Sequence, residues 1–520
     1  MTETVRSYSG GRKVRATQIR YGRRRIGSYV TSAAVVLLVL GLWTTRDSHQ
    51  IETLIPADHA YQIATTDFLN KGERVAESRV WTALPSAWGL DVVPRHLSDK
   101  LGMPAWVLNN LLPGRTHVSG NDLKNFGDVL IVAKMTRIGC LLERFNGWIP
   151  GIEDDPAGGL ELRHVLKADL YYAVRGRVLL VSRSRATLIR ALTLRPEDAL
   201  GEERLARVIE ESGNEDVCGV VSISPDDPLG QVAAGASFAL RIDPAAATLK
   251  CKLALRPDCA FADGLFTDLG PQRLQTPPDG CVEISMNFNR SAGDVYGAVV
   301  KAAGHDEKMA ELWQTWTSGS ATGPLLTGVA QLLAPLGPGI CLTWCGIDCN
   351  EMVPVPELVA RFDAKPDVVL SAFEALPHPP EDARPWDPYF RYDAATGRLM
   401  IPSVGGPSMQ PIAGMLGDSL LVSTSTRAAE PILSGDAAPK FLDTPGNLYV
   451  RVRPKQAAEA VVKAGELLAG AHLLKGYTPE SYQQAAAPWL ANASALEEVG
   501  ALVACDKGEI MLTVGLVCSN

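Results

Sequence analysis

The sequence predicts an α+β protein, with a single N-terminal transmembrane helix followed by two tandem, duplicated α+β modules built on antiparallel sheets. Three observations support this prediction: an uncharged apolar run near the N-terminus, short phrases that recur in the same order in both halves, and strand-like runs joined by hairpin turns without regular alternation with helices. With 520 residues, 46% hydrophobic and 21% charged, the chain is long enough for two or more globular domains.

Charge and hydropathy set the N-terminus apart. Residues 1–25 contain eight Lys or Arg residues and one acidic residue, Glu3, so they carry +7, and the remaining residues carry −15 of the formal net charge of −8. Residues 26–45 are uncharged, and at about 1.5 Å per residue a helix of this length spans about 30 Å, the thickness of a bilayer core. Because cations favour a cytoplasmic flank, we predict a basic cytoplasmic tail (1–25), a transmembrane helix (26–45) and a single-pass inner-membrane protein whose bulk is extracytoplasmic.

The sequence disfavours two alternatives to this topology. A cleaved signal peptide is disfavoured because the letters GLWTT before Arg46 lack the small residues of a cleavage site. A lipid-binding or nucleic-acid-binding role for the basic tail is not needed, since topology alone explains its charge. We therefore expect the membrane as a partner and no nucleic acid, and the acidic exported body disfavours anionic polymers.

Several phrases recur along the chain in the same order. GRVLLVSRS is followed 241 residues later by GDSLLVSTS, and other pairs recur at offsets between 217 and 230 residues. Similar offsets with local changes in loop length indicate a duplicated unit. We therefore predict an exported module 1 at 46–274 and a module 2 at 275–520. The pairs are 176–184 with 417–425, 56–63 with 277–284, 141–145 with 358–362, and 224–235 with 453–465.

Each module is expected to contain the same series of elements. A hairpin at 170–182, turning at Arg175-Gly176, leads into a serine pair and a helical run, and a further strand and a closing hairpin follow. The closing hairpin of module 2, at 500–517, is expected to turn at Lys507-Gly508. Ser184 and Ser425 precede helical runs, where a hydroxyl that caps the helix is more common than a functional serine.

Two regions have no counterpart in the other half. Residues 75–115 contain Trp81, Trp88 and Trp106, which indicate a helical lobe with an aromatic groove or, more commonly, ordinary core packing. Residues 377–411 are rich in Pro and Gly and predict an exposed loop with a short hairpin, either functional or a linker.

The ten cysteines include one cluster, CLTWCGIDC, with Cys341, Cys345 and Cys349 four residues apart. Three thiolates on one face could hold zinc or an iron–sulfur cluster, but the phrase is strand-like and lacks the paired spacing of such sites, which favours buried thiols or disulfide halves. The turn at 507–508 would place Cys505 opposite Ile510 and Cys518 near Glu497, so these two cysteines are not expected to bridge.

No recognised catalytic pattern is present. The eight histidines are scattered, and HExxH, GxSxG, GxxxxGK[ST], GxGxxG and EF-hand patterns are all missing from the sequence. We therefore assign no catalytic, cofactor-binding or metal-binding residue and expect no cofactor.

The letters LIPAD (54–58) after the apolar run, the letters YYAVRGRVLLVS (171–182) and the overall layout resemble an uncharacterised family of N-terminally anchored bacterial extracytoplasmic proteins that carry a domain of unknown function. The resemblance implies no catalytic residue. The leading hypothesis is a non-enzymatic, membrane-anchored extracytoplasmic binding or scaffold protein, which uses the surface between its modules to engage a protein or envelope polymer; no small-molecule ligand is assigned. The alternatives are a structural envelope component and an envelope hydrolase with a dispersed site, which clustered polar side chains of shifted pKa in one pocket would reveal.

Overall fold

The structure of the protein is a computed structural model. Apart from a few isolated positions, it describes residues 50–65, 116–121, 128–144, 151–166, 169–201, 215–224, 232–256, 270–295, 336–350, 353–376, 390–403, 406–434, 440–506 and 508–519. The predicted tail (1–25) and transmembrane helix (26–45) lie outside these residues, and so do the three tryptophans Trp81, Trp88 and Trp106.

Within the described part of the chain, no helix is both long enough and apolar enough to cross a membrane. The two longest described helices are α15 (Pro454–Gly470), with 17 residues, and α16 (Pro479–Ser494), with 16 residues. Both fall short of the roughly 20 apolar residues that a span requires, and both carry polar side chains along their length. For the part that the structure describes, the predicted single-pass architecture and inner-membrane location are therefore wrong.

The predicted balance of helices and strands was also wrong. The described residues form twenty strands and six α-helices, so the described part of the chain is mainly antiparallel β-sheet rather than α+β. Internal contacts divide the chain into two compact units: unit 1 comprises 1–59, 64–70 and 97–206, and unit 2 comprises 60–63, 71–96 and 207–520. This division does not coincide with the expected boundary at 274/275, and the modules 46–274 and 275–520 stay a prediction.

The sheet of unit 1 has the strand order β2–β3–β7–β6–β5–β4, with every pair antiparallel. Its helices are α6 (Arg137–Arg144) and α7 (Arg185–Leu192), with short 3-10 turns at Ile51–Leu54 and Pro196–Asp198. The strands are β2 (Thr116–Gly120), β3 (Leu130–Lys134), β4 (Ile152–Asp154), β5 (Arg163–Val165), β6 (Leu170–Arg175) and β7 (Val178–Ser182).

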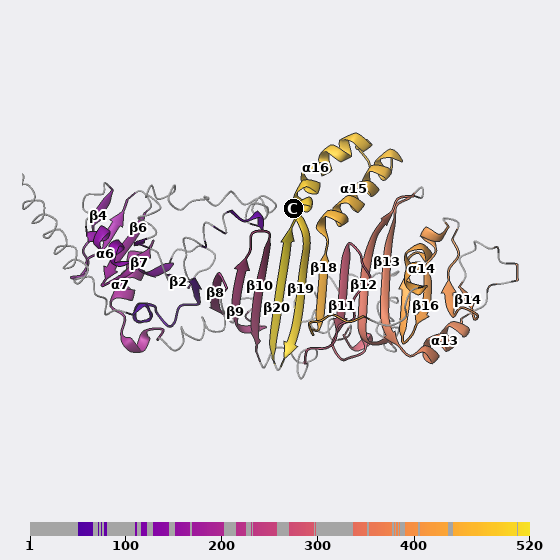
Figure 1. Ribbon diagram of the computed structural model, residues 1–520, viewed down its shortest axis with the longest axis horizontal. Helices are drawn as coiled ribbons and strands as arrows, with labels where there is room; N and C mark the ends of the chain where they lie inside the picture. The colour runs from indigo at the N-terminus through magenta and orange to yellow at the C-terminus, as the bar shows by residue number, and fades with distance from the viewer. Residues whose placement is uncertain are drawn as a thin grey trace, which may run out of the picture. The chain divides into compact units, whose positions relative to one another are not determined.

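Unit 2 contains a longer sheet, in which strands far apart in the sequence lie side by side (Figure 1). From β8 the order is β8–β9–β10–β20–β19–β18–β11–β12–β13–β17–β16–β15–β14, all antiparallel, and β1 (Tyr61–Thr65) pairs with β8. The strands are β8 (Val217–Ser222), β9 (Ala233–Ile242), β10 (Ala246–Leu255), β11 (Val282–Asn287), β12 (Leu336–Asp348), β13 (Val355–Ala364), β14 (Arg391–Asp393), β15 (Arg398–Met400), β16 (Ile412–Leu416), β17 (Ser419–Ser423), β18 (Leu448–Val452), β19 (Leu496–Asp506) and β20 (Glu509–Cys518).

The strand order of unit 1 recurs inside unit 2. The run β12–β13–β17–β16–β15–β14 follows the order of β2–β3–β7–β6–β5–β4, with each strand number raised by ten. The recurring phrases 176–184 and 417–425 each cover a two-residue turn, a strand and a helix cap. This is a likeness of topology, and the duplication of the sequence itself stays a prediction.

The local expectations around these phrases are largely confirmed. Ser184 accepts a hydrogen bond from the backbone N–H of Thr187, and Ser425 accepts one from Ala428, so both serines cap helices. The first turn is displaced by one residue from the expected Arg175-Gly176: Arg175 pairs with Val178, which leaves Gly176 and residue 177 in the turn. Gly176 has φ +63°, a conformation that glycine adopts without steric cost.

The predicted closing hairpin is confirmed, since Asp506 pairs with Glu509 and Cys505 with Ile510. A bulge near the start of β19 places Cys518 opposite Leu496 rather than Glu497. The short hairpin expected within 377–411 is present as β14 and β15.

Helices cover the unit 2 sheet at several places. On one face, Leu336, Ile340 and Phe362 pack against α13 (Pro366–Glu374) through Val369 and Phe373. On the other, Val359 and Leu421 pack against Ala429 of α14 (Thr426–Leu433). Because successive side chains of a strand point to opposite faces, β13 contributes to both cores, and its polar residues Arg361 and Asp363 share the face of Val359.

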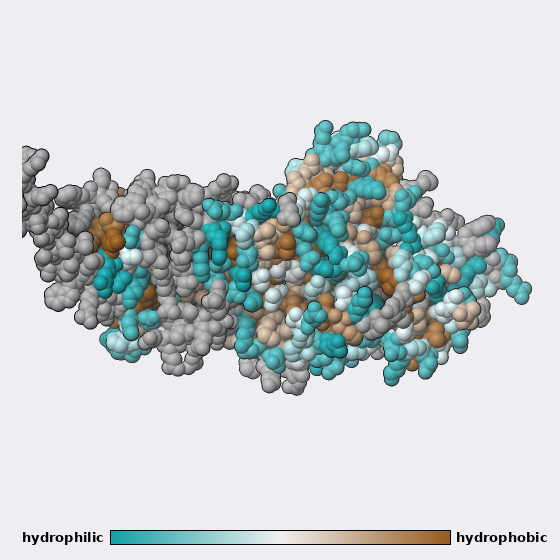
Figure 2. All heavy atoms as spheres, in the orientation of Figure 1, coloured by the Kyte–Doolittle hydropathy of each residue, from teal (hydrophilic) through white to brown (hydrophobic). Residues whose placement is uncertain are grey.

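The helices α15 and α16 form a hairpin beside the strand ends of β18, β19 and β20 (Figure 1). They approach closely at Gly465, where a Cβ atom would overlap the ring of Tyr482. Figure 2 shows hydrophobic side chains gathered around this hairpin. Leu473, Tyr477 and Trp489 are exposed there.

Candidate functional site

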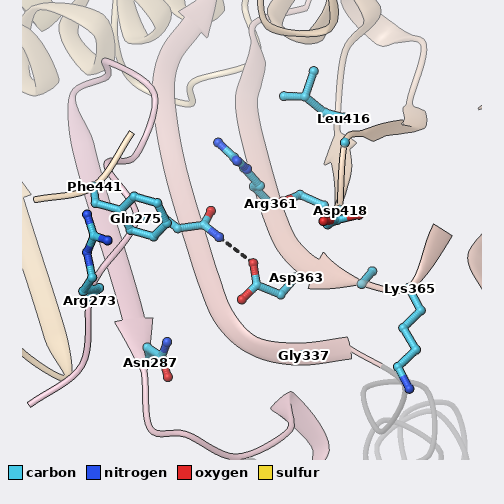
Figure 3. Close-up of a pocket in the computed structure, with 13 residues that line it drawn as sticks. Arg273, Gln275, Asn287, Gly337, Arg361, Asp363, Lys365, Leu416, Asp418 and Phe441 are labelled. Carbon is cyan, nitrogen blue, oxygen red and sulfur yellow. Dashed lines mark hydrogen bonds between the residues drawn. The ribbon is translucent and has the colours of Figure 1, made fainter. Parts of the chain in front are cut away.

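A cavity of about 590 Å³ lies in unit 2, beside the end of β13 (Figure 3). Its walls come from β11, β12, β13, the turn between β16 and β17, and two loop segments that run antiparallel to each other through the bridges Gln272–Gly446 and Gln275–Phe441. The lining residues are Arg273, Gln275, Asn287, Gly337, Arg361, Asp363, Ala364, Lys365, Leu416, Gly417, Asp418, Ser419 and Phe441.

Asp363 is fixed by two donors. Gln275 Nε2 donates to its Oδ1 at 2.5 Å, and the backbone N–H of Gly339 donates to its Oδ2 at 3.0 Å. A side chain at residue 337 would crowd Asp363, because a Cβ there would lie 2.8 Å from the Asp363 Cβ. Burial raises the pKa of Asp363, although both hydrogen bonds and the charge of Arg361 oppose this shift.

Arg361 lies in the middle of β13, between Cys341 of β12 and Leu421 of β17. Its exposed fraction is 8%, and its Nε and Nη2 atoms have no hydrogen-bond partner among the described residues. In Figure 3 its guanidinium extends away from Asp363. A buried donor left without a partner costs about 1–3 kcal/mol, more for a charged group. Arg361 therefore presents donor capacity that the described protein does not use.

The other charged residues of the lining come from separate segments of the chain (Figure 3). Arg273 stacks over the ring of Phe441, with its Cζ 4.5 Å from the ring centroid. Lys365 and Asp418 also line the cavity. The lining thus contains three cationic and two carboxyl side chains, together with an apolar surface from Leu416, Ala364 and Phe441.

A second buried charge on the sheet, Glu283 of β11, is fully satisfied. Arg451 Nε donates to its Oε2 at 2.8 Å, Arg453 Nη1 to its Oε1 at 2.7 Å, and the Gly280 N–H to its Oε1 at 3.0 Å. Asp279 lies 3.2 Å from both arginines. This network ties β11 to β18 and leaves Glu283 no free lone pair directed at a ligand, so it is structural.

Asp348, at the end of β12, is similarly engaged. It accepts hydrogen bonds from Arg427 Nη1 at 2.7 Å, from the Asn350 side chain at 2.7 Å and from Ser408. Burial works against the charged form, but the hydrogen bonds from Ser408, Asn350 and Arg427 and the charge of Arg427 outweigh it, so the pKa of Asp348 is lowered. This cluster anchors α14 to the sheet.

The cysteine cluster lies on and just after β12. Cys341 is buried, and its thiol lies 3.6 Å from the Ser285 hydroxyl, while Cys345 and Cys349 are partly exposed. Burial, with a smaller contribution from Glu357, raises the pKa of Cys345 to about 11, so this thiol stays protonated at neutral pH and is a poor metal ligand. Within the described ranges, no group of three His, Cys, Asp or Glu side chains is placed to hold a metal ion.

Cys505 and Cys518 are both free thiols in the structure, in line with the expectation that they do not bridge. Neither contributes to the cavity.

Sequence reasoning did not identify the cavity. The phrase LVARF (358–362) was recognised only as a recurring block, although it contains Arg361. A signal was present, because an arginine inside an otherwise apolar strand, flanked by Glu357 and Asp363, is rare in a buried position. The partners of β13 come from residues 336–348 and 419–423, and this pairing could not be deduced from local patterns.

Comparisons with known proteins give no family. No protein-family model matches the chain, and no curated protein matches it. Among solved structures, three crystal forms of TP0453 show weak similarity. Form III is 8% identical and covers 41% of this chain and 82% of that chain, with a TM-score of 0.27. Form I is 7% identical, with 40% and 80% covered and a TM-score of 0.26, and form IV is 8% identical, with 42% and 86% covered and a TM-score of 0.24. At these scores the similarity supports no conclusion about fold or function.

Proposed function

We propose that this protein is a non-enzymatic binding or scaffold protein that holds part of its ligand or partner in the cavity of unit 2. The observation that carries this proposal is the buried guanidinium of Arg361, whose Nε and Nη2 atoms lack hydrogen-bond partners among the described residues. Buried polar groups in proteins are nearly always paired, so a ligand that supplies the missing acceptors would remove the cost of leaving them unpaired.

The chemistry of the lining favours binding over catalysis. The thirteen lining residues include no His or Cys, and the carboxylate oxygens of Asp363 already accept hydrogen bonds from Gln275 and Gly339. A nucleophile needs a base within hydrogen-bond reach, and the described lining residues show no such pair. As the partner we propose a protein or an envelope polymer. A group at its end or on a side chain would supply the hydrogen-bond acceptors that Arg361 lacks among the described residues.

One observation favours a second candidate, a hydrolase with a dispersed site. Burial raises the pKa of Asp363 in a cavity lined by other polar side chains, and such shifts are common at active sites. A hydrolase would turn over an activated ester such as p-nitrophenyl acetate, and Asp363→Asn would abolish that turnover. The binding proposal expects no turnover above the buffer rate in either protein.

A defined set of probes tests the binding proposal by thermal shift: benzoate, benzamide, inorganic phosphate, glucose, spermidine and trialanine. We expect at least one probe to raise the melting temperature of the full chain in a saturable manner, because a ligand that binds only the folded state stabilises it. Phe441→Ala, at the cavity wall, should weaken this response. Phe390→Ala removes a ring that is 44% exposed, against 38% for Phe441, and that lies outside the lining, so it should leave the response unchanged. Failure of every probe, or equal responses from both variants, would refute the proposal.

A further inference from the structure

The two unpartnered atoms of Arg361, Nε and Nη2, belong to one edge of the planar guanidinium. Their N–H bonds are nearly parallel, which is the arrangement that matches the two oxygens of a carboxylate in a bidentate pair. A single carbonyl oxygen can accept from both donors, as Met135 O does from Nε and Nη2 of Arg177, but a carboxylate gives each donor an oxygen of its own. The pair of unpartnered donors therefore favours a group with two coplanar oxygens.

The surroundings of Arg361 do not supply that group among the described residues. Asp363, two residues along the same strand, accepts its hydrogen bonds from Gln275 and Gly339, and Arg361 extends away from it (Figure 3). The neighbouring Cys341 thiol lies near the Gln275 carbonyl and the Ser285 hydroxyl. A buried cation without a bidentate partner attracts an anion more strongly than an exposed one, because the local dielectric constant is low.

The composition of the cavity favours a singly charged ligand with an apolar body. With both carboxyls ionised, the three cationic and two carboxyl side chains of the lining have a net charge of +1, which a monoanion neutralises and a dianion such as phosphate exceeds. Leu416 and Phe441 provide apolar surface, and about 590 Å³ lies within the range of about 300–1,000 Å³ common for small-molecule sites.

We propose that the cavity of unit 2 recognises a monocarboxylate with an attached apolar group, whose two oxygens accept hydrogen bonds from Arg361 Nε and Nη2. This inference rests on the proposed binding function and names its ligand class. Arg361 is the specificity-determining residue, and Leu416 and Phe441 contact the apolar body.

Calorimetric titration of the full chain at neutral pH and low salt tests this inference, with benzoate as the probe. Benzamide has nearly the same shape but no charge, and inorganic phosphate has the charge but no apolar body. We expect saturable benzoate binding, at least tenfold weaker binding of benzamide, and no measurable phosphate binding. A tenfold change corresponds to about 1.4 kcal/mol, the lower end of the range for hydrogen bonds to charged groups.

Two variants test whether Arg361 is the residue that binds benzoate. Arg361→Met removes the donors while retaining an unbranched side chain, and it should abolish benzoate binding. Arg361→Lys retains the charge but not the two parallel N–H donors, and it should weaken benzoate binding about tenfold or more. Arg290→Met, which removes an exposed arginine, is the matched control and should bind like the unmodified protein. Melting profiles of all variants establish that each is folded.

Some outcomes would overturn the inference. Equal affinity for benzoate and benzamide, tighter binding of phosphate, or undiminished benzoate binding by folded Arg361→Met would each do so. A different outcome is that benzoate shows no binding while another probe still stabilises the protein and Phe441→Ala weakens that stabilisation. In that case the proposed ligand class is wrong and the binding function stands. If no probe acts, the binding function fails as well.

Discussion

Two buried charges on the same sheet show how differently single residues can be used. Glu283 is surrounded by donors from Arg451, Arg453 and Gly280, whereas Arg361 keeps two N–H groups unpaired among the described residues. The first arrangement holds strands together, and the second leaves donors that we propose a ligand satisfies. Sequence alone could not distinguish them, because both are charged residues inside apolar strands and the difference depends on Arg451 and Arg453, which lie 168 and 170 residues from Glu283 along the chain.

The contrast predicts opposite effects on stability. Arg361→Met should leave the free energy of unfolding unchanged or raise it by about 1–3 kcal/mol, because it removes an unpaired buried charge. Glu283→Gln should lower it by about 3–5 kcal/mol, because Arg451 and Arg453 would lose their buried partner. Urea unfolding measures both values. A larger loss for Arg361→Met than for Glu283→Gln would show that the guanidinium is structural.

The raised pKa of Asp363 predicts that the stability of the folded protein depends on pH. Because its pKa in the folded protein is raised mainly by burial, the folded state binds more protons than the unfolded state between the ordinary pKa near 3.8 and the raised one. Stability contributed by this group is therefore present below the ordinary pKa and is lost as pH rises through the raised pKa. Asp363→Asn should lack this component, so acidification from neutral pH should favour the unmodified protein over the variant. Chemical unfolding across this pH range would measure the difference, and a parallel pH dependence would contradict it.

At the scale of elements, the sequence predicted what local chemistry controls. The helix caps at Ser184 and Ser425 were correctly expected from a hydroxyl between a strand and a helical run, and the hairpin between β19 and β20 from its glycine turn. The turn between β6 and β7 was displaced by one residue, because Gly176 occupies the first rather than the second turn position. Local signals fix such elements but not their neighbours in the sheet.

The cap at Ser425 provides a direct test at this scale. Its hydroxyl accepts a hydrogen bond from the Ala428 N–H at 3.0 Å and is fully buried, so Ser425→Ala should cost about 0.5–2 kcal/mol of unfolding free energy. Ser371→Ala, at an exposed position inside α13, is the matched control and should change stability by less than about 0.5 kcal/mol. Equal effects of the two substitutions on thermal unfolding would argue against the cap.

The contact between α15 and α16 gives a further prediction. Gly465→Ala should destabilise the protein by about 1–3 kcal/mol, because the new methyl group would overlap the ring of Tyr482. Tyr482→Ala should relieve this overlap, so the double variant should lose less stability than the sum of the single variants. Gly515→Ala, where the methyl group meets no atom within 4 Å, serves as the control. Strict additivity in denaturant unfolding would contradict the close packing.

At the scale of the molecule, the sequence led to the wrong architecture. The sequence predicted a single-pass anchor and a pair of α+β modules. The described part of the protein is mainly antiparallel sheet and contains no helix able to cross a membrane. The error in fold has a physical cause: β10 pairs with β20 and β11 with β18, and such long-range pairing leaves no local signature. The cavity could not be foreseen for the same reason, since its lining extends from Arg273 to Phe441.

The central claim is that Arg361 receives a carboxylate. The most direct measurement is the ¹⁵N NMR spectrum of arginine Nε–H groups in the full chain during addition of benzoate, with Arg361→Lys to identify the resonance. A resonance that is missing from the variant should shift progressively with benzoate and remain unmoved by benzamide. If the Arg361 resonance does not respond while benzoate demonstrably binds, the ligand lies elsewhere and the account of the site is wrong.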